Sequence, residues 1–351
     1  MRDVAVISFA QSPSVRADTQ QNDVEILMPV VREAIEGSGI ARQEIGFTVS
    51  GSCDYLSGQP FAFVMALDAV GAWPPIVESH VEMDGAWALY EAWVRLQIGD
   101  IDSALVYSFG KSSLGDIRDV LVTMLDPYYV APLWPDSISL AALQARAMLD
   151  GGVCTNEQMA EVAARSRRDA MANPMAQVAG ACEVAQLIEE PYLLSPLRKH
   201  DCAPISDGAA AVVLAAGDLA QHVSARPAWI SGIDHRIEPQ ALGVRDLTKS
   251  TSTALAAEKV GLFRSQIDVA EIHAPFSHQE LILREALRLD DTIIVNPSGG
   301  ALAANPIMST GLIRVGEAAR RVMDGTATRA VAHATSGPCL QQNLVCVLEA
   351  R

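Results

Sequence analysis

Short apolar runs alternate with amphipathic segments of helical length in the first part of the chain. Residues 3–10, 45–51 and 103–110 form nearly continuous apolar runs, which predicts strands that are buried on both faces. Residues 25–40 and 85–100 instead place apolar side chains at helical spacing. This alternation predicts an α/β architecture in which helices cover the sheets.

The pattern changes over residues 115–200. Proline-rich turns at 124–135 are followed by an alanine-rich helical stretch that carries a basic cluster. A buried strand is predicted at 206–217, and from residue 228 the alternation of strands and helices resumes. We therefore expect residues 115–200 to be an inserted loop domain.

When the sequence is aligned with itself at a shift of 226 residues, the predicted helix after Gly85 aligns without a gap with the predicted helix after Gly311. A shift of 222 residues also pairs 39–45 with 261–267. Any two amphipathic helices share some letters, but identities in register between bracketing glycines favour an internal duplication. The identical pairs are Gly85/Gly311, Glu91/Glu317, Ala92/Ala318, Arg95/Arg321, Gly99/Gly325 and Ala104/Ala330.

The duplication predicts two similar α/β halves, residues 1–225 with the loop domain and residues 226–351, with a site between them. The length agrees, because 351 residues of which 50% are hydrophobic exceed what one compact core usually holds. The net charge of −16 argues against nucleic-acid binding, so an anionic ligand needs a local basic patch.

The cysteines and the hydropathy indicate the compartment. The six cysteines are scattered without CxxC or metal-ligand spacing, which favours reduced thiols and no metal site. No apolar stretch approaches the roughly 20 residues that a membrane span requires. We therefore expect a cytoplasmic protein with no membrane partner.

Two carboxylates occur together in "HVEMDGAWAL", residues 80–89. Glu82 and Asp84 lie at a predicted strand-to-helix turn, where free backbone N–H groups suit an anion, a nucleophile or an oxyanion. The simpler interpretation is that Asp84 is an N-cap and Glu82 an acid that favours the helix dipole. Both interpretations remain open from the sequence.

A histidine ends the predicted strand in "VAEIHAPFSHQELILREAL", residues 269–287. His273 at the carboxyl end of a strand faces the crevice where α/β proteins bind ligands, although a lone histidine is often structural. His278, one helical turn later, is expected at the surface.

Two further turns contain candidate residues. Gly299 and Gly300 permit close approach of the backbone to a ligand or to another strand. Cys339 lies in a Gly-Pro turn between two apolar strands. Its thiol is either an acid or base, or a buried and inert side chain.

Four stretches resemble, in order, the thiolase superfamily on its sterol-carrier or lipid-transfer branch: 173–177, 195–214, 271–282 and 295–306. The resemblance implies a five-layered αβαβα fold built from two fused halves. It also implies a dimer or tetramer that acts on acyl-CoA thioesters, with no cofactor besides the coenzyme A of the substrate.

The family's catalytic elements are only partly present. The Cys-x-Ser-Gly nucleophile motif is replaced by Glu82 to Gly85, and a carboxylate cannot form the family's acyl-thioester intermediate. The His-x-x-Phe motif survives as His273 and Phe276, which implies that His273 binds the thioester oxygen. The Gly-His-Pro motif has Asn305 in place of the activating histidine.

The last motif of the family is altered, and the residues expected to bind the phosphates of coenzyme A are chosen by their charge. The terminal Cys-x-Gly motif is represented by Ser336-Gly337-Pro338-Cys339, with its thiol shifted. The loop-domain arginines form the best basic patch for the phosphates of coenzyme A, and they are Arg165, Arg167 and Arg168.

Three functions follow from this comparison. The first is retro-aldol cleavage of a β-hydroxyacyl-CoA, as in thiolase-like aldolases of steroid side-chain breakdown, which lack the nucleophile and usually work with a small OB-fold (DUF35-like) partner. The candidate bases are Glu82, Asp84 and Cys339. Tyr128 and Tyr129, in the loop domain, are the only nearby tyrosines that could serve as the acid or base instead. The second is a non-catalytic subunit that supports an active thiolase-like paralogue. The third is a thiolase with a relocated cysteine.

Overall fold

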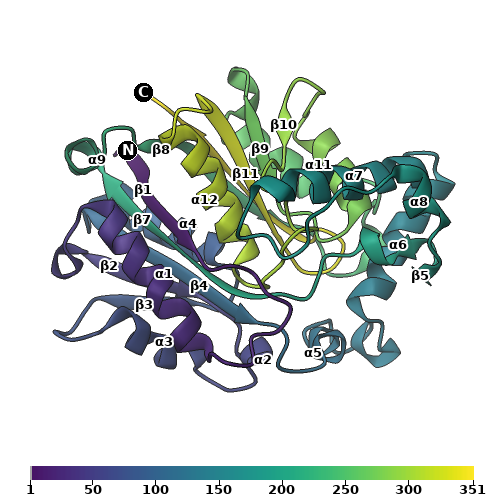
Figure 1. The fold of residues 1–351 in the computed structure, drawn as a ribbon, viewed down its shortest axis with the longest axis horizontal. Helices are drawn as coiled ribbons and strands as arrows, with labels where there is room; N and C mark the ends of the chain where they lie inside the picture. Colours follow the sequence, from purple (N-terminus) through teal and green to yellow (C-terminus); the bar gives the residue numbers. More distant parts are fainter. Residues whose placement is uncertain (1) are drawn as a thin grey trace.

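A computed structural model describes residues 2–351 and has ten strands in one mixed sheet, in the order β10-β9-β11-β12-β8-β1-β7-β4-β2-β3 (Figure 1). The predicted α/β class is confirmed. The strands are β1 (Val4–Gln11), β2 (Phe47–Gly51), β3 (Glu78–Val81), β4 (Ser103–Lys111), β7 (Asp207–Ala216), β8 (Ala228–Ile237), β9 (Val269–Ile272), β10 (Ile294–Val295), β11 (Arg329–Ser336) and β12 (Gln342–Glu349).

The strand order is the same in both halves when it is read outward from the centre. The first half runs β1-β7-β4-β2-β3 and the second runs β8-β12-β11-β9-β10, and β1 and β8 join the two antiparallel. The ungapped shift deduced from the sequence carries β4 onto β11, and the second shift carries β2 onto β9. The internal similarity in the sequence therefore corresponds to a repeated strand order.

Helices form three layers around this sheet (Figure 1). Helices α4 (Gly85–Ile98) and α12 (Thr310–Met323) share one core with strands of both halves. Helices α1 (Asp23–Ser38) and α3 (Ala62–Val70) cover the other face of the first half. Helices α10 (Thr251–Lys259) and α11 (Ser277–Ala286) cover that of the second. The two halves of the sheet thus form two β layers, which alternate with the three helix layers as αβαβα.

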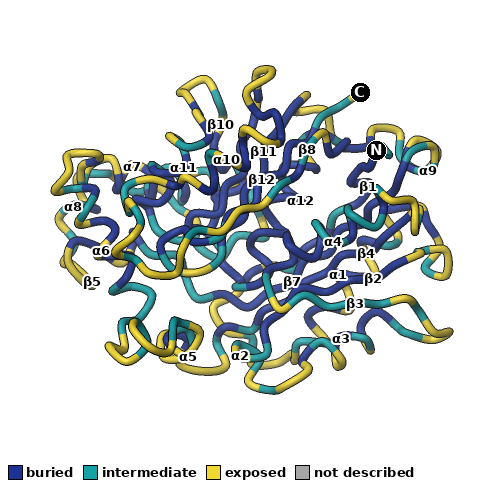
Figure 2. The backbone as a smooth tube through the Cα atoms, turned by 180° about the vertical axis from the view of Figure 1, so that it is seen from behind, coloured by how far each residue is buried: buried dark blue, intermediate teal, exposed yellow. Residues whose placement is uncertain are grey.

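The connection between β4 and β7 contains the helices of the predicted loop domain. Helix α6 packs its alanine-rich face into the core of the second half, and α7 packs on α11. Exposed residues concentrate in this outer region, whereas α4, α12 and the central strands are buried (Figure 2). The elements are α5 (Ile117–Thr123), α6 (Ser137–Asp150), α7 (Asn156–Asp169), α8 (Val184–Glu189), β5 (Tyr192–Leu194) and β6 (Leu197–Arg198); α2 (Asp54–Ser57) and α9 (Gly217–Val223) lie elsewhere.

No helix within residues 2–351 is long and apolar enough to cross a membrane. The six cysteines are all unpaired.

The paired glycines of the duplication lie where α4 and α12 meet. A Cβ on Gly85 would lie 2.7 Å from the Cβ of Ser108, and a Cβ on Gly311 would lie 2.6 Å from the Cβ of Ala334 and overlap the Asp84 carboxylate. These contacts explain why each helix has a glycine in its first turn, because any side chain there would overlap the neighbouring strand and the start of the other helix.

We expect Gly311→Ala to lower the free energy of unfolding by about 1–3 kcal/mol, because the methyl group overpacks a closed junction. Urea unfolding followed by circular dichroism measures this change. Gly243→Ala is the matched control, since no atom lies within 4 Å of a Cβ added there. Equal stability of the two variants would contradict the close contact at Gly311.

Candidate active site

A pocket of about 280 Å³ opens where β9 and β11 end and where the loops before α4 and α12 meet. Its polar groups are few and include Asp84, His273, Asn305 and Arg118. Most of the wall is apolar, from Ile117, Leu121, Met124, Ile138, Ala141, Ile205, Phe276, Ile307, Met308 and Leu340. A concave apolar site with a few convergent polar groups is typical of a small-molecule binding site.

His273 lies at the pocket directly after β9, as the sequence predicted. Its Nδ1 accepts a hydrogen bond from the backbone N–H of Thr335 at 3.4 Å, which assigns the proton of the neutral ring to Nε2. Burial, together with the neighbouring His333 and Arg314, lowers the pKa of His273 to about 3. His273 is therefore a neutral Nε2–H donor at physiological pH.

Asn305 supplies a second donor beside His273. Both side chains line the pocket, and the Asn305 Oδ1 accepts from the hydroxyl of Thr310 at 3.0 Å. That contact orients the amide so that its NH₂ group remains a donor. Two preorganised donors in an apolar pocket can stabilise the oxyanion of a thioester enolate.

Asp84 is the carboxylate that reaches this pocket. It caps α4 by accepting from the Ala86 N–H at 2.8 Å, which confirms the N-cap interpretation. The same carboxylate accepts from Gly311 N at 2.8 Å and Leu312 N at 3.0 Å, so it also binds the first turn of α12. A second contact joins the two helix starts, because the carbonyl of Met308, just before α12, accepts from the Gly85 N–H at 2.8 Å.

The environment of Asp84 suits acid–base chemistry. Burial raises the pKa of its carboxyl to about 7, although the three N–H donors and Arg314 favour the charged form. A carboxylate has about four lone-pair positions, and three are occupied here, which leaves one on Oδ2 for a substrate proton. A group that titrates near neutral pH can both take and return a proton.

Glu82 lies outside the lining of the pocket, although it occupies the sequence position of the missing nucleophile. Its Oε1 accepts from the backbone N–H of Asp54 at 2.7 Å, at the start of α2, and its Oε2 lies 3.2 Å from Nε2 of His80. The ring of His80 is stacked on Phe63, and its Nδ1 lies 3.0 Å from the Ser50 hydroxyl. Glu82 thus stabilises a local turn, and the catalytic expectation for it is not supported.

Cys339 lines the pocket as an unreactive thiol. Its Sγ donates to the carbonyl of Leu140 at 3.4 Å, and burial raises its pKa to about 11. The second thiol in the lining, Cys202, has its pKa raised to about 12 by burial and by the neighbouring Asp201. Both remain protonated at neutral pH, and the thiolate is the nucleophilic form. Gly337 and Phe276 also line the pocket.

Gly299 and Gly300 do not line this pocket. The carbonyl of Gly299 accepts from Ser166 Oγ of α7 at 2.5 Å, and a Cβ on Gly299 would lie 2.6 Å from that of Ala303. Both glycines have φ above +60°, at 96° and 65°. They allow the loop to pack against the inserted helices, and they lie outside the lining of this pocket.

The predicted basic patch also lies away from the pocket. Arg165 pairs with the buried Glu280, and Arg168 lies 3.0 Å from Asp169. Arg167 follows on the same helix and does not line the pocket either. Arg118 is the arginine of the lining, and no local pattern around it in the sequence marks this position.

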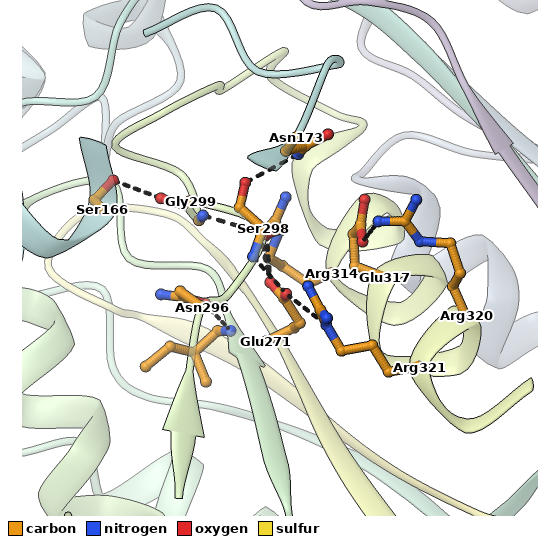
Figure 3. Close-up of polar contacts among 12 residues, drawn as sticks. Ser166, Asn173, Glu271, Asn296, Ser298, Gly299, Arg314, Glu317, Arg320 and Arg321 are labelled. Atoms are coloured by element: carbon orange, nitrogen blue, oxygen red, sulfur yellow. Dashed lines mark hydrogen bonds and ion pairs between the residues drawn. The ribbon is translucent and has the colours of Figure 1, made fainter. Parts of the chain in front are cut away.

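A polar network around Glu271 fixes the end of β9 (Figure 3). Buried Glu271 accepts from Arg314 Nη1 and from Ser298 Oγ, both at 2.7 Å. The network joins β9 to α12 and to the following loop. His278 is buried as well, with its Nε2 3.2 Å from Gln144 Oε1 of α6, which corrects the expectation that it lies at the surface.

The buried histidines predict sensitivity to acid. Burial lowers the pKa of His273 and His278 to about 3 and that of His333 to about 4. In the unfolded chain they titrate near pH 6.5, so from about pH 6.5 down to about pH 4 the unfolded state binds up to three more protons. Asp84, with its raised pKa, gives an opposite but single-proton contribution.

We therefore expect the urea midpoint of unfolding to fall as the pH is lowered from about 7 to about 5. Chemical denaturation at a series of pH values measures it. A midpoint that is constant or rises toward acid would contradict the neutral state of these histidines.

No model of a known protein family matches the sequence. The chain is 29% identical over 371 aligned positions to an acetyl-CoA acetyltransferase of Methanothermobacter thermautotrophicus, with 93% of this chain and 94% of that protein covered. It is 25% identical over 288 positions to sterol carrier protein 2 of Bos taurus, which covers 69% of this chain and 53% of that protein.

Solved structures share the fold over the whole chain. The Ltp2-ChsH2(DUF35) aldolase has a TM-score of 0.83 at 18% identity, with 99% of this chain and 98% of that chain covered. The human mitochondrial 3-ketoacyl-CoA thiolase has a TM-score of 0.80 at 16% identity, with coverage of 100% and 99%.

Two halves of equal strand order, with a pocket at the strand ends between them, define a thiolase-like protein. The chain is similar in sequence and in fold to proteins of the thiolase superfamily, including members of its sterol-carrier, lipid-transfer branch.

Proposed function

We propose that this protein cleaves a carbon–carbon bond in a β-hydroxyacyl-CoA by a retro-aldol reaction. One observation carries the proposal: the pocket holds a carboxyl group with a pKa of about 7 and a donor pair, His273 and Asn305, but no thiol with a low pKa. Thiolysis requires a thiolate, whereas retro-aldol cleavage requires a base and an enolate cradle.

The proposed step needs no group beyond the pocket's own residues and the substrate. The Asp84 carboxylate takes the proton of the β-hydroxyl, and a carbonyl forms there as the bond between Cα and Cβ breaks. The electron pair moves onto Cα and the thioester oxygen, where the His273 Nε2–H and the Asn305 amide stabilise the enolate. Asp84 then returns its proton to Cα, which gives a ketone or aldehyde and a shortened acyl-CoA.

The wall of the pocket supports a bulky apolar acyl group, of the lipid or steroid type. Ile117, Leu121 and Met124 from the α5 segment line the same cavity as Phe276 and Leu340. Burial of apolar ligand surface against such a wall is favourable. No cofactor is proposed besides the coenzyme A of the substrate. Six unpaired thiols are consistent with action in the cytoplasm.

We also propose that the chain works in a complex, as a homodimer or with a small OB-fold protein. The structural neighbour named Ltp2-ChsH2(DUF35) aldolase combines two components, and a benzoylsuccinyl-CoA thiolase relative from Thauera aromatica is named as a subunit. Exposed apolar side chains in the loop domain, among them Tyr128, Tyr129 and Trp134, are available for contact.

The test is incubation of the purified protein, alone and with an OB-fold partner, with steroid and straight-chain β-hydroxyacyl-CoA. Mass spectrometry of the products should detect a ketone or aldehyde and a shortened acyl-CoA in equal amounts. Absence of both products under both conditions contradicts the proposal. It would instead support the alternative of a non-catalytic subunit, which co-purification of an active paralogue would identify.

Acyl transfer by a relocated thiol is the second candidate, and the relatives named acetyl-CoA acetyltransferase favour it. Cys339 would be its nucleophile, although burial raises the pKa of that thiol. Acyl transfer predicts a covalent acyl group on Cys339 after mixing with acyl-CoA, which intact-protein mass spectrometry detects. Retro-aldol cleavage predicts an unmodified protein.

A further inference from the structure

A second cavity, of about 350 Å³, lies beside the opposite end of strand β11 from the pocket. It is lined where β1 and β11 begin and β12 ends, beside the last turns of α4. Strand β11 connects the two sites, because Arg329 at its start lines the cavity and Ser336 at its end lines the pocket. Eight residues of strand separate these ends by about 23 Å.

Arginines dominate this cavity, in a chain of net charge −16. Arg2, Arg264, Arg329 and Arg351 line it with two carboxylates, those of Asp3 and Glu349. Asp3 lies 2.7 Å from Arg351, and Glu349 lies 3.5 Å from Arg329. Within residues 2–351, Arg264 has no ion-pair partner, which leaves positive charge uncompensated.

Arg329 is held in a fixed position by backbone carbonyls. It is 8% exposed, and its guanidinium donates to the backbone carbonyls of Leu262 at 2.9 Å, Ser265 at 2.5 Å and Gly261 at 3.1 Å. Burial and the nearby positive charge of Arg264 lower its pKa. An anion between the two guanidinium groups would relieve their repulsion.

Two polar atoms in the lining lack partners, and both come from the end of α4. Within the described residues, Trp93 Nε1 and Gln97 Oε1 are buried without a hydrogen bond. A buried donor left unsatisfied costs about 1–3 kcal/mol, so an indole N–H beside a cationic cavity favours an acceptor from a ligand.

We propose that this cavity binds a small phosphoryl anion, either inorganic or the terminal group of a phosphate ester. The oxygens of the anion accept from Arg264 and from Trp93 Nε1–H, and Arg329 supplies fixed positive charge behind them. Phosphoryl oxygens are suited to guanidinium donors. The site is separate from the acyl-CoA pocket and does not depend on the proposed reaction.

Isothermal titration calorimetry of the full chain with inorganic pyrophosphate and, separately, with a simple phosphate monoester tests the proposal at low ionic strength. We expect binding of one anion per chain, weakened about tenfold or more by Arg264→Gln, since a charge-assisted contact is lost. Trp93→Phe should weaken it less, while Arg16→Gln, an exposed arginine elsewhere, should leave it unchanged.

The two ligands separate the sources of the anion, because tighter binding of the monoester assigns the site to a phosphorylated metabolite. Two results would overturn the proposal. One is no binding at millimolar anion, and the other is an equal loss in Arg264→Gln and Arg16→Gln. Loss of binding in Arg118→Gln would place the anion in the acyl-CoA pocket and would also overturn it.

Discussion

Asp84→Asn should lower kcat for cleavage of a β-hydroxyacyl-CoA by about 10³-fold, because the amide cannot take the hydroxyl proton. The substitution also turns an NH₂ group toward backbone N–H donors that the carboxylate now binds. We therefore expect a loss of unfolding free energy of about 1–3 kcal/mol as well. Steady-state kinetics and urea unfolding of the same preparation measure both.

The pH profile distinguishes a base from a structural cap at Asp84. The general base must be ionised and its pKa is raised to about 7, so kcat/KM of the wild type should rise as the pH passes through about 7. The residual activity of Asp84→Asn should lack this rise. Glu82→Gln is the control, because that carboxylate lies outside the pocket, and its profile should match the wild type. If the rise of kcat/KM near pH 7 were lost in Glu82→Gln and kept in Asp84→Asn, the general base would be Glu82 and not Asp84.

His273→Ala should lower kcat by about 10²–10³-fold with a smaller change in KM, because the donor acts on the enolate oxygen that develops in the transition state. Stability should change little, since the ring makes one long contact with the Thr335 N–H. His273→Gln retains an N–H donor and should recover part of the activity.

His278→Gln is the matched control for His273. His278 is equally buried but lies outside the pocket lining, bonded to Gln144. We expect it to change stability and to leave kcat near that of the wild type. Equal losses of kcat in His273→Ala and His278→Gln would show that the effect on His273 is structural.

The sequence predicts most of the fold because periodicity and register are local properties. Buried strands and amphipathic helices appear as apolar patterns, and Gly85 and Gly311 mark the junction because no side chain fits there. The place of His273 was also predictable, since a residue that ends a parallel strand lies at the ligand edge of the sheet.

The rest of the site depends on contacts between distant segments. Spacing alone cannot show whether Glu82 or Asp84 turns into the pocket, because the choice is made by partners on α2 and α12. Arg118 reaches the pocket only when the insertion folds over the sheet. His278 is likewise buried only because α6 covers α11.

The central claim is that Asp84 and His273 cleave a carbon–carbon bond without a thiolate. The activity of the Cys339→Ala variant tests this claim most directly. The variant and the wild type are each given a β-hydroxyacyl-CoA and a 3-oxoacyl-CoA with free coenzyme A, and the products are quantified by mass spectrometry. We predict that both proteins convert the β-hydroxyacyl-CoA to a ketone or aldehyde and a shortened acyl-CoA at similar rates. The account would be contradicted if the wild type thiolysed the 3-oxoacyl-CoA, did not cleave the β-hydroxy substrate, and lost its thiolysis activity in Cys339→Ala.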